Sequence, residues 1–329
     1  MIKNFSKNYK KLFSFILVFL LVLSSSARAG FFSDLFGKKS DVIVDIPSEP
    51  ISSGNVSSSN SVLFGATDIG TRLDLSRFNI ESPKRIDVDE SFLSNLSNEP
   101  VATGYGPTRT DDNIPLNAFH YRDKYGDLGG VFIADVKEGE KKIYLTFDCG
   151  YEAGHTFEIL DALKEKNVRA VFFITGHYAR DSEDHVKRMI DEGHIVGNHT
   201  WSHIDCARST LKEVQSNIFK VHDFVKNKFD YEMKLFRYPY GNFSEQTLKF
   251  ISMQGYKQIF WTFGYKDWDT KNQPTAEFGK VQIVSAACPG NIYLLHAESK
   301  TNASILAECI DEIKASGFTI GDPIDLLVD

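Results

Sequence analysis

From about Ile114 onward the sequence alternates short apolar runs with amphipathic stretches, and this alternation constrains the fold more than any other feature. Runs such as "IYLTF" and "NIYLLH" are rich in β-branched and aromatic residues, which is typical of buried strands. Stretches such as "TFEILDALKEK" and "LKEVQSNIFKVHDFVKNKF" have the spacing of amphipathic helices. The seven expected strands are 143–147, 168–174, 194–198, 233–236, 256–263, 291–296 and 318–320.

Regular alternation of strands and helices predicts parallel strands, in either a barrel or a doubly wound sheet. Neither a G-x-G-x-x-G pattern nor a P-loop follows the first strand, so a nucleotide-binding sheet is less favoured. We therefore expect an α/β fold, a distorted (β/α) barrel of about seven parallel strands, over residues 114–329.

The first 29 residues have the three parts of a secretory signal peptide. The basic segment "MIKNFSKNYKK" precedes the apolar run "LFSFILVFLLVL" and the small-residue stretch "SSSARAG". The apolar run is short for a membrane-spanning helix. We expect cleavage after Ala29 and an exported, extracytoplasmic protein, secreted or associated with the cell wall, with no stable membrane span after processing.

Residues 30–113 are rich in Ser and Asn and include "SEPISSGNVSSSNS", which predicts a poorly ordered linker or N-terminal extension. The net charge of the chain is −7, and residues 1–29 contain five basic residues and no acidic ones, so cleavage would leave a net charge of −12. Such an acidic surface argues against nucleic acid as a partner. An anionic wall polymer would have to be held by local contacts in a groove.

Ionisable side chains follow five of the expected strands. The active sites of βα barrels lie at the carboxyl ends of their strands, so these side chains are expected to share one pocket. They are Asp148 after the first strand, His199 and His203 in "NHTWSH", Arg237 in "RYPYG", Asp267 beside Trp268 in "YKDWD", and His296 in "LLH".

His199 and His203 have the spacing H-x-x-x-H, which can direct two imidazoles at one metal ion. The alternative is one core histidine and one surface histidine. Asp148, expected beside that metal, can act as a general base toward a bound water. A structural ion pair with Arg237 is the other interpretation, and the two are compatible because an arginine keeps a neighbouring carboxylate ionised.

His296 is the candidate for the second proton transfer. A carboxylate partner such as Asp267 makes an imidazole more basic, so that it can stay protonated as a general acid. The alternative is a polar residue that only caps the end of its strand.

These residues carry a resemblance to a known family. In chain order, "TFDCG", "HTWSH", "RYPYG", "DW" and "LLH" resemble the five motifs of the NodB-type polysaccharide deacetylases, carbohydrate esterase family 4, over about residues 115–329. "IYLTFDCGYEAGHT", "RMIDEGHIVGNHTWSH" and "IYLLHAESKTNA" resemble in particular the peptidoglycan N-acetylmuramic acid deacetylases that prepare muramic lactam in the spore cortex.

The resemblance implies metal-assisted hydrolysis of the N-acetyl group of N-acetylmuramic acid in peptidoglycan glycan strands. It implies that Asp148 is the base and that His199 and His203 bind the metal. Arg237 would orient Asp148, and His296, tuned by Asp267, would be the acid.

The resemblance also implies that the backbone N–H of Tyr240 helps to hold the oxyanion. Trp268 and Leu294 would wall the pocket for the acetyl methyl group. Two rival functions stay open: deacetylation of N-acetylglucosamine in wall or chitin-like glycans, and glycan binding by an inactive relative. Retention of the proton-transfer residues argues against the second.

Cys149 departs from the family pattern, because most members have a second aspartate there as a metal ligand. Three interpretations stay open. Cys149 could ligate the metal, which with two imidazoles would favour zinc. It could merely pack, so that two histidines and water hold a divalent metal weakly. It could instead pair with Cys206, since an exported protein tolerates disulfides.

Overall fold

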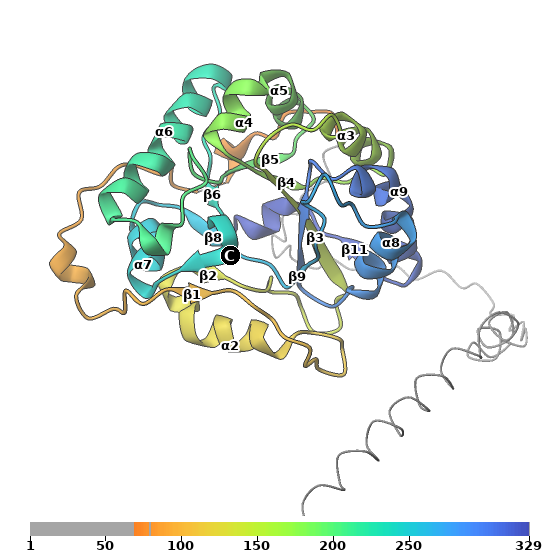
Figure 1. Cartoon of the computed structure of the whole chain (residues 1–329), viewed down its shortest axis with the longest axis horizontal. Coiled ribbons are helices and arrows are strands. Elements are labelled where there is room, and N and C mark those ends of the chain that lie inside the picture. Colours follow the sequence, from red (N-terminus) through yellow and green to blue (C-terminus); the bar gives the residue numbers. More distant parts are fainter. Residues whose placement is uncertain (1–68, 79, 329) are drawn as a thin grey trace, which may run out of the picture. The chain divides into compact units, whose positions relative to one another are not determined.

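The computed structural model describes residues 69–78 and 80–328, and a parallel sheet is its centre. The sheet has nine strands in the order β2-β8-β6-β5-β4-β3-β10-β9, and β11 pairs with β3. Helices surround this half-barrel (Figure 1), as expected for a (β/α) barrel. The strands are β2 (Gly130–Val131), β3 (Lys142–Cys149), β4 (Val171–Ile174), β5 (Ile195–Asn198), β6 (Leu235–Phe236), β8 (Lys257–Ile259), β9 (Phe263–Gly264), β10 (Asn291–His296) and β11 (Thr319–Ile320).

The two amphipathic stretches form α3 (Thr156–Glu165) and α6 (Leu211–Phe229), which confirms both predicted helices. A capping box formed by Thr210 and Glu213 starts α6 and satisfies backbone N–H groups that have no partner within the helix. The remaining helices are α2 (Leu116–Tyr125), α4 (Gly176–Asp181), α5 (Glu183–Asp191), α7 (Glu245–Met253), α8 (Ala276–Ser285) and α9 (Lys300–Ala315). Short 3-10 helices are η1 (Leu75–Arg77), η2 (Glu90–Leu93), η3 (Gly126–Leu128), η4 (Cys206–Arg208), η5 (Pro239–Gly241) and η6 (Pro323–Leu326).

The strand expected at 256–263 is two strands. β8 pairs with β6 and β2, whereas β9 pairs with β10, in the other half of the strand order. Between them the backbone N–H of Phe260 donates to Val131 O and that of Thr262 donates to Ile292 O. The run is apolar throughout, so its periodicity could not reveal this break.

The described part of the N-terminal extension packs against the barrel. Leu93 is 1% exposed and belongs to the main core. β1 (Val101–Ala102) pairs antiparallel with β7 (Asn242–Phe243). The prediction of a poorly ordered segment is therefore wrong for residues 69–78 and 80–113. Its few apolar contact residues are irregularly spaced, so no periodicity marked them.

The predicted signal peptide, residues 1–29, lies outside the described residues, as do residues 30–68 of the predicted extension. Among the helices that the structure describes, none combines the length and the apolar character needed to cross a membrane.

Alternate residues of β3 face two different environments, and this alternation positions the site. Leu145 and Phe147 belong to the large core cluster, which the surrounding helices also contribute to. Tyr144 belongs to a second cluster inside the half-barrel, which Leu326 and Leu327 help to fill. The hydroxyl of Tyr144 donates to Asp325 at 3.0 Å, beside the amino end of β3. The interior is therefore filled at that end, and the carboxyl ends of the strands remain for the site.

Candidate active site

Asp148 ends the inward-facing row of β3 and forms a buried ion pair with Arg237. Nη1 of Arg237 donates to Asp148 Oδ1 at 2.9 Å and to Thr146 Oγ1 at 2.7 Å. Nε and Nη2 of Arg237 donate to the carbonyl oxygens of Ile259 and Phe260, both at 3.0 Å. The guanidinium is thus fixed by partners on β3 and at the end of β8. Burial alone would raise the pKa of Asp148, but Arg237 and the nearby histidines hold it below its ordinary value.

His199 follows β5 and points its imidazole at Asp148. Its Nδ1–H donates to the carbonyl oxygen of Arg237 at 2.9 Å, and its Nε2 lies 3.5 Å from Asp148 Oδ2. The ring of His203 lies 4.9 Å from that of His199, centroid to centroid. Burial lowers the pKa of both histidines, that of His203 to about 4. Both rings are therefore neutral at pH 7, as metal ligation requires.

His296 ends β10 and is held by Asp267. Nδ1–H of His296 donates to Asp267 Oδ1 at 2.7 Å, and the backbone N–H of His296 donates to Oδ2 at 2.9 Å. The side-chain amide of Asn302, on α9, also donates to Oδ2 at 2.6 Å. Burial alone would lower the pKa of His296, but Asp267 outweighs it and raises this pKa to about 9. His296 is therefore an imidazolium at neutral pH.

Strand pairing places Asp148 beside His296. β3 and β10 are neighbouring parallel strands, and His296 is the register partner of Asp148. Both line one cavity of about 630 Å³. The cavity is lined by Asp148, Gly150, Tyr151, Thr175, His177, His199, Trp201, Ser202, His203, Tyr238, Tyr240, Trp261, Trp268, Leu294, His296 and Glu298.

Tyr240, Trp268 and Leu294, to which the resemblance assigns substrate contacts, also line this cavity. Tyr240 has a φ of 61° and is 64% exposed as a residue. Its ring lies edge-on to that of His203, with ring centroids 4.6 Å apart. The ring of Trp268 lies 5.7 Å from that of His296. Together these residues form a largely apolar wall beside Asp148 and His296. The oxyanion role of the Tyr240 N–H stays a prediction.

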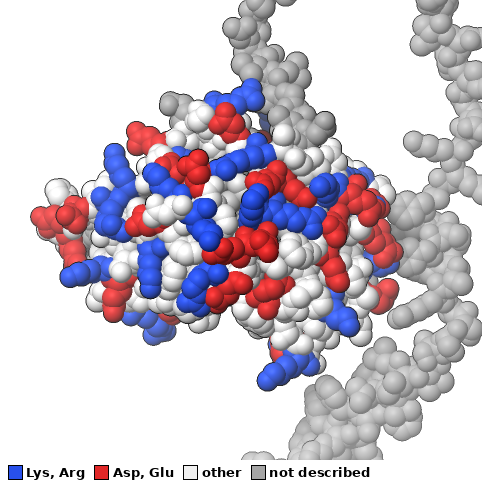
Figure 2. Space-filling model, turned by 90° about the horizontal axis from the view of Figure 1, so that it is seen from above, with Lys and Arg blue, Asp and Glu red and all other residues white. Residues whose placement is uncertain are grey.

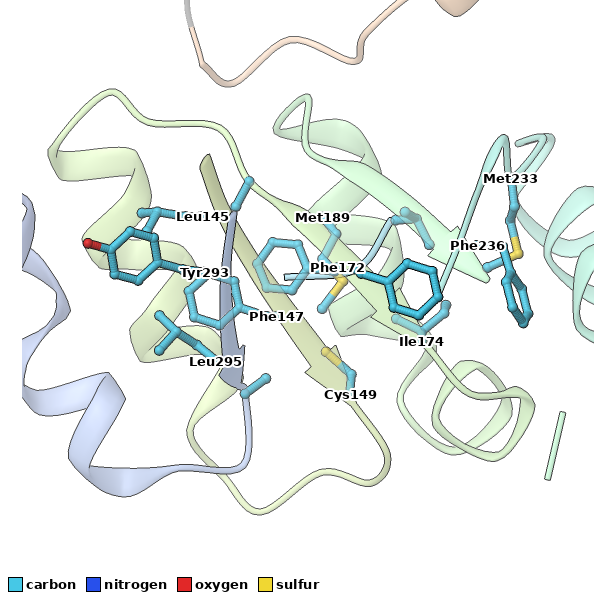
Figure 3. Close-up of a cluster of buried hydrophobic side chains, with 14 of the residues drawn as sticks. Leu145, Phe147, Cys149, Phe172, Ile174, Met189, Met233, Phe236, Tyr293 and Leu295 are labelled. Carbon is cyan, nitrogen blue, oxygen red and sulfur yellow. The ribbon is translucent and has the colours of Figure 1, made fainter. Parts of the chain in front are cut away.

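Cys149 lies on the opposite face of β3 from Asp148. It is fully buried in the large core cluster, and Figure 3 shows it in the same cluster as Phe147, Ile174 and Met189. Burial raises the pKa of its thiol well above the ordinary value, so no thiolate is available. Cys149 and Cys206 are both free. Of the three interpretations of Cys149, the structure agrees with packing in the core. It does not agree with metal ligation by Cys149 or with a disulfide to Cys206. The physical reason is the alternation of a strand, which turns consecutive side chains to opposite faces.

The donors for a divalent metal are few. Over residues 69–78 and 80–328, no group of three or more His, Cys, Asp and Glu side chains has an arrangement that could hold a metal ion. His199 and His203 supply two neutral nitrogens, one short of the three protein ligands of typical catalytic zinc sites. The predicted metal thus fits only a two-histidine site completed by water.

Several cavity residues were not singled out from the sequence as site residues. Tyr151 and Trp201 lie within the quoted motifs "GYE" and "HTWSH", and Trp261 lies within an expected strand. His177, to which the sequence assigned no role, also lines the cavity. Glu298 stands two residues after His296, in the turn that follows β10.

A larger hollow, about 890 Å³, lies elsewhere and contains none of the predicted site residues. It is lined by residues 72–78, 80–82 and 230–232 and by Lys234. The face of the molecule in Figure 2 mixes acidic and basic side chains, without a broad area of basic ones. The carboxylate and imidazole groups that can transfer protons, Asp148 and His296, line the smaller cavity.

Comparison with known proteins agrees with this site. The family model described as polysaccharide deacetylase matches residues 135–259. The peptidoglycan-N-acetylmuramic acid deacetylase PdaA of Bacillus subtilis (strain 168) is 40% identical over 236 residues, which cover 71% of this chain and 88% of that protein. A peptidoglycan-N-acetylglucosamine deacetylase of Bacillus cereus is 29% identical over 205 residues, covering 62% of this chain and 72% of that protein.

The fold of this chain is also similar to that of a solved carbohydrate esterase. The solved structure of Bacillus subtilis PdaA, a family 4 carbohydrate esterase, matches with a TM-score of 0.66 and 35% identity, covering 70% of this chain and 98% of that one. Sequence and structure thus confirm the resemblance that the five ordered motifs indicated. This chain belongs to the polysaccharide deacetylase family.

Proposed function

We propose that this protein removes the N-acetyl group from N-acetylmuramic acid in peptidoglycan. One observation carries the proposal. A carboxylate held by an arginine, Asp148 with Arg237, faces the same cavity as an imidazole held by a carboxylate, His296 with Asp267. The similarity to a protein named as a deacetylase of N-acetylmuramic acid, at 40% identity, supports the choice of sugar.

The two pairs suit the two proton transfers of amide hydrolysis. Asp148, ionised at neutral pH, takes a proton from the water that attacks the acetyl carbon. His296, protonated at neutral pH, gives a proton to the leaving nitrogen as the C–N bond breaks. The products are acetate and the free amine of the sugar. The Tyr240 N–H is proposed to donate to the oxygen that carries negative charge in the transition state.

A divalent metal, with zinc favoured, would be held by His199 and His203 together with water. When bound, it would polarise the acetyl carbonyl as a Lewis acid. With only two protein nitrogens, we expect binding to be weak. Asp148 and His296 perform their proton transfers from positions that the protein itself fixes.

The alternative substrate is N-acetylglucosamine in peptidoglycan. The relative from Bacillus cereus bears that name and is 29% identical. An inactive glycan-binding protein is less well supported, because binding alone needs neither a protonated His296 nor an ionised Asp148. We further propose export of the protein after cleavage at Ala29, since peptidoglycan lies outside the cytoplasm.

Acetate release from purified peptidoglycan tests the activity. Asp148→Asn keeps the shape of the side chain but removes the proton acceptor, and loss of a general base costs about 10²–10⁴-fold in rate. We expect the wild type to release acetate and the folded variant to lose activity by about that factor. Near-full turnover by folded Asp148→Asn would contradict the mechanism.

A further inference from the structure

The segment "AESKTNA", residues 297–303, directly follows His296, and the proposed mechanism uses none of its residues. Asn302 in this segment is fully buried and is the third residue of α9. It is not among the residues that line the cavity. Its side chain contacts Asp267, the partner of the proposed general acid. Any effect of Asn302 on the reaction would therefore have to pass through Asp267 and His296.

The amide of Asn302 is held in one orientation by three partners. Its Nδ2 group donates to Asp267 Oδ2 at 2.6 Å and to the carbonyl oxygen of His296 at 3.2 Å. Its Oδ1 atom accepts a hydrogen bond from the hydroxyl of Tyr265. A carboxylate and a carbonyl group only accept hydrogen bonds, so the nitrogen of the amide must face them. The Tyr265 hydroxyl, which donates to the other side of the amide, fixes this orientation.

Asn302 also determines which oxygen of Asp267 faces the ring of His296. Oδ2 of Asp267 accepts from Asn302 and from the backbone N–H of His296, which leaves Oδ1 for the Nδ1–H group of the imidazole. Because a carboxylate is planar, two donors on Oδ2 fix the direction of Oδ1. That direction orients the imidazole, and with it the Nε2–H bond, which is the one left to give its proton to the substrate.

The main chain of Asp267 is joined to the same end of α9. Nε2 of Gln273 donates to the carbonyl oxygens of Asp267 at 2.6 Å and of Asp269 at 3.1 Å. Oε1 of Gln273 accepts from Ser299 Oγ at 2.7 Å and from the backbone N–H of Thr301 at 3.1 Å. The start of α9 thus holds the main chain of Asp267 through Gln273 and its carboxylate through Asn302.

We infer that Asn302 is a positioning residue for the general acid and acts through Asp267. The inference rests on the proposed function, in which His296 gives a proton to the leaving nitrogen. Because Asn302 lies outside the cavity, its loss should leave substrate binding intact. It should slow the proton transfer, since a misplacement of about 1 Å can cost 10²-fold in rate.

The test measures kcat and KM for acetate release from soluble peptidoglycan strands by the wild type, Asn302→Leu and Asn291→Leu. Leucine has nearly the size of asparagine but forms no side-chain hydrogen bonds. Asn291 is a matched control, because it is 1% exposed, begins β10 at the end opposite His296 and donates its amide to Ala286 O at 2.7 Å. Both variants should unfold at a lower urea concentration than the wild type, since each leaves buried polar groups without partners.

Only Asn302→Leu should lose activity. We expect its kcat to fall by about 10–100-fold, with KM changed by about twofold or less, as for an interaction that matters in the transition state alone. Asn302→Ser is a milder change, and it replaces Asn302→Leu if that variant does not fold. Its hydroxyl is too short to take the place of the amide, so the same loss of kcat is expected. A wild-type kcat in the folded Asn302 variants, or an equal loss of kcat in Asn291→Leu, would overturn the inference.

If the wild type releases no acetate, the proposed function fails, and proton NMR of the ligand-free protein then tests Asn302 separately. The Nδ1–H proton of His296, bonded to a buried carboxylate, should give a far-downfield resonance, identified by its loss in Asp267→Asn. We expect this resonance in the wild type and in Asn291→Leu. In Asn302→Leu it should move upfield or disappear through exchange with water. An unchanged resonance in Asn302→Leu would show that Asn302 does not position the pair.

Discussion

Two ion pairs give neighbouring side chains opposite protonation states at neutral pH. Arg237 keeps Asp148 an anion, and Asp267 keeps His296 a cation. Each pair is buried, so solvent screens it little. In the proposed mechanism Asp148 and His296 thus carry the charges they need before substrate binds, and Arg237 and Asp267 act only through them.

The pH dependence of activity should reveal the acid. Activity needs protonated His296, whose pKa is about 9, so kcat/KM for acetate release from peptidoglycan should fall as pH rises through about 9. Asp267→Asn removes the carboxylate that raises this pKa, so the alkaline fall should move to lower pH. Measuring kcat/KM against pH for both proteins checks this. An alkaline limb at the same pH in Asp267→Asn would show that another group is responsible.

Cys149 should affect stability rather than metal binding. Cys149→Ser should bind zinc about as tightly as the parent, because the side chain faces the core. Cys149→Asp should not strengthen binding, and it should lower the free energy of unfolding by several kcal/mol, since it buries an unpaired charge. Calorimetric titration with zinc and urea denaturation measure the two effects. Tighter zinc binding by Cys149→Asp would place this side chain at the metal instead.

At the scale of elements, the parallel order of the strands explains why the site could be anticipated. Asp148 and His296 stand at the ends of strands that were visible as apolar runs, and His199 follows another such strand; parallel strands align their carboxyl ends. The partners of these residues, Arg237 and Asp267, stand in loops after short strands. Their assignment depended on the order of the motifs. Glu298 lies past a strand end, where no apolar pattern continues.

Other elements could not be predicted for physical reasons. β2 and β6 have two residues each, too few to show a period. The direction of the Cys149 side chain depends on β3 remaining regular to its last residue, which the sequence leaves open. The segment before α2 is held by scattered contacts, such as that between the Ile86 N–H and Gln254, and not by a repeating apolar face.

A pair of neighbouring residues tests whether that segment belongs to the folded domain. Leu93 is 1% exposed, whereas Phe92 beside it is 77% exposed. Leu93→Ala should lower the free energy of unfolding by about 2–5 kcal/mol through the lost burial and the cavity left behind. Phe92→Ala should change it by about 0.5 kcal/mol or less. Urea denaturation of both variants gives the values, and equal small effects would mean that residues 80–113 are an appendage.

At the scale of the whole molecule, the half-barrel is closed by apolar packing at one end and opens into the cavity at the other. Leu326 and Leu327 help fill the interior near the amino ends of the strands. Aromatic side chains, Asp148 and His296 line the opening at the carboxyl ends. The cavity of about 630 Å³ suits a sugar with its substituents better than a whole polymer segment. Recognition of one sugar within a longer chain follows from this shape.

Mass analysis of muropeptides is the most direct test of whether this protein removes the acetyl group of N-acetylmuramic acid. Purified peptidoglycan is incubated with the wild type or with Asp148→Asn, digested to muropeptides and fragmented to separate the two sugars. We expect loss of acetyl from muramic acid with the wild type and little or none with the variant. Loss of acetyl from glucosamine alone, with muramic acid intact, would contradict it.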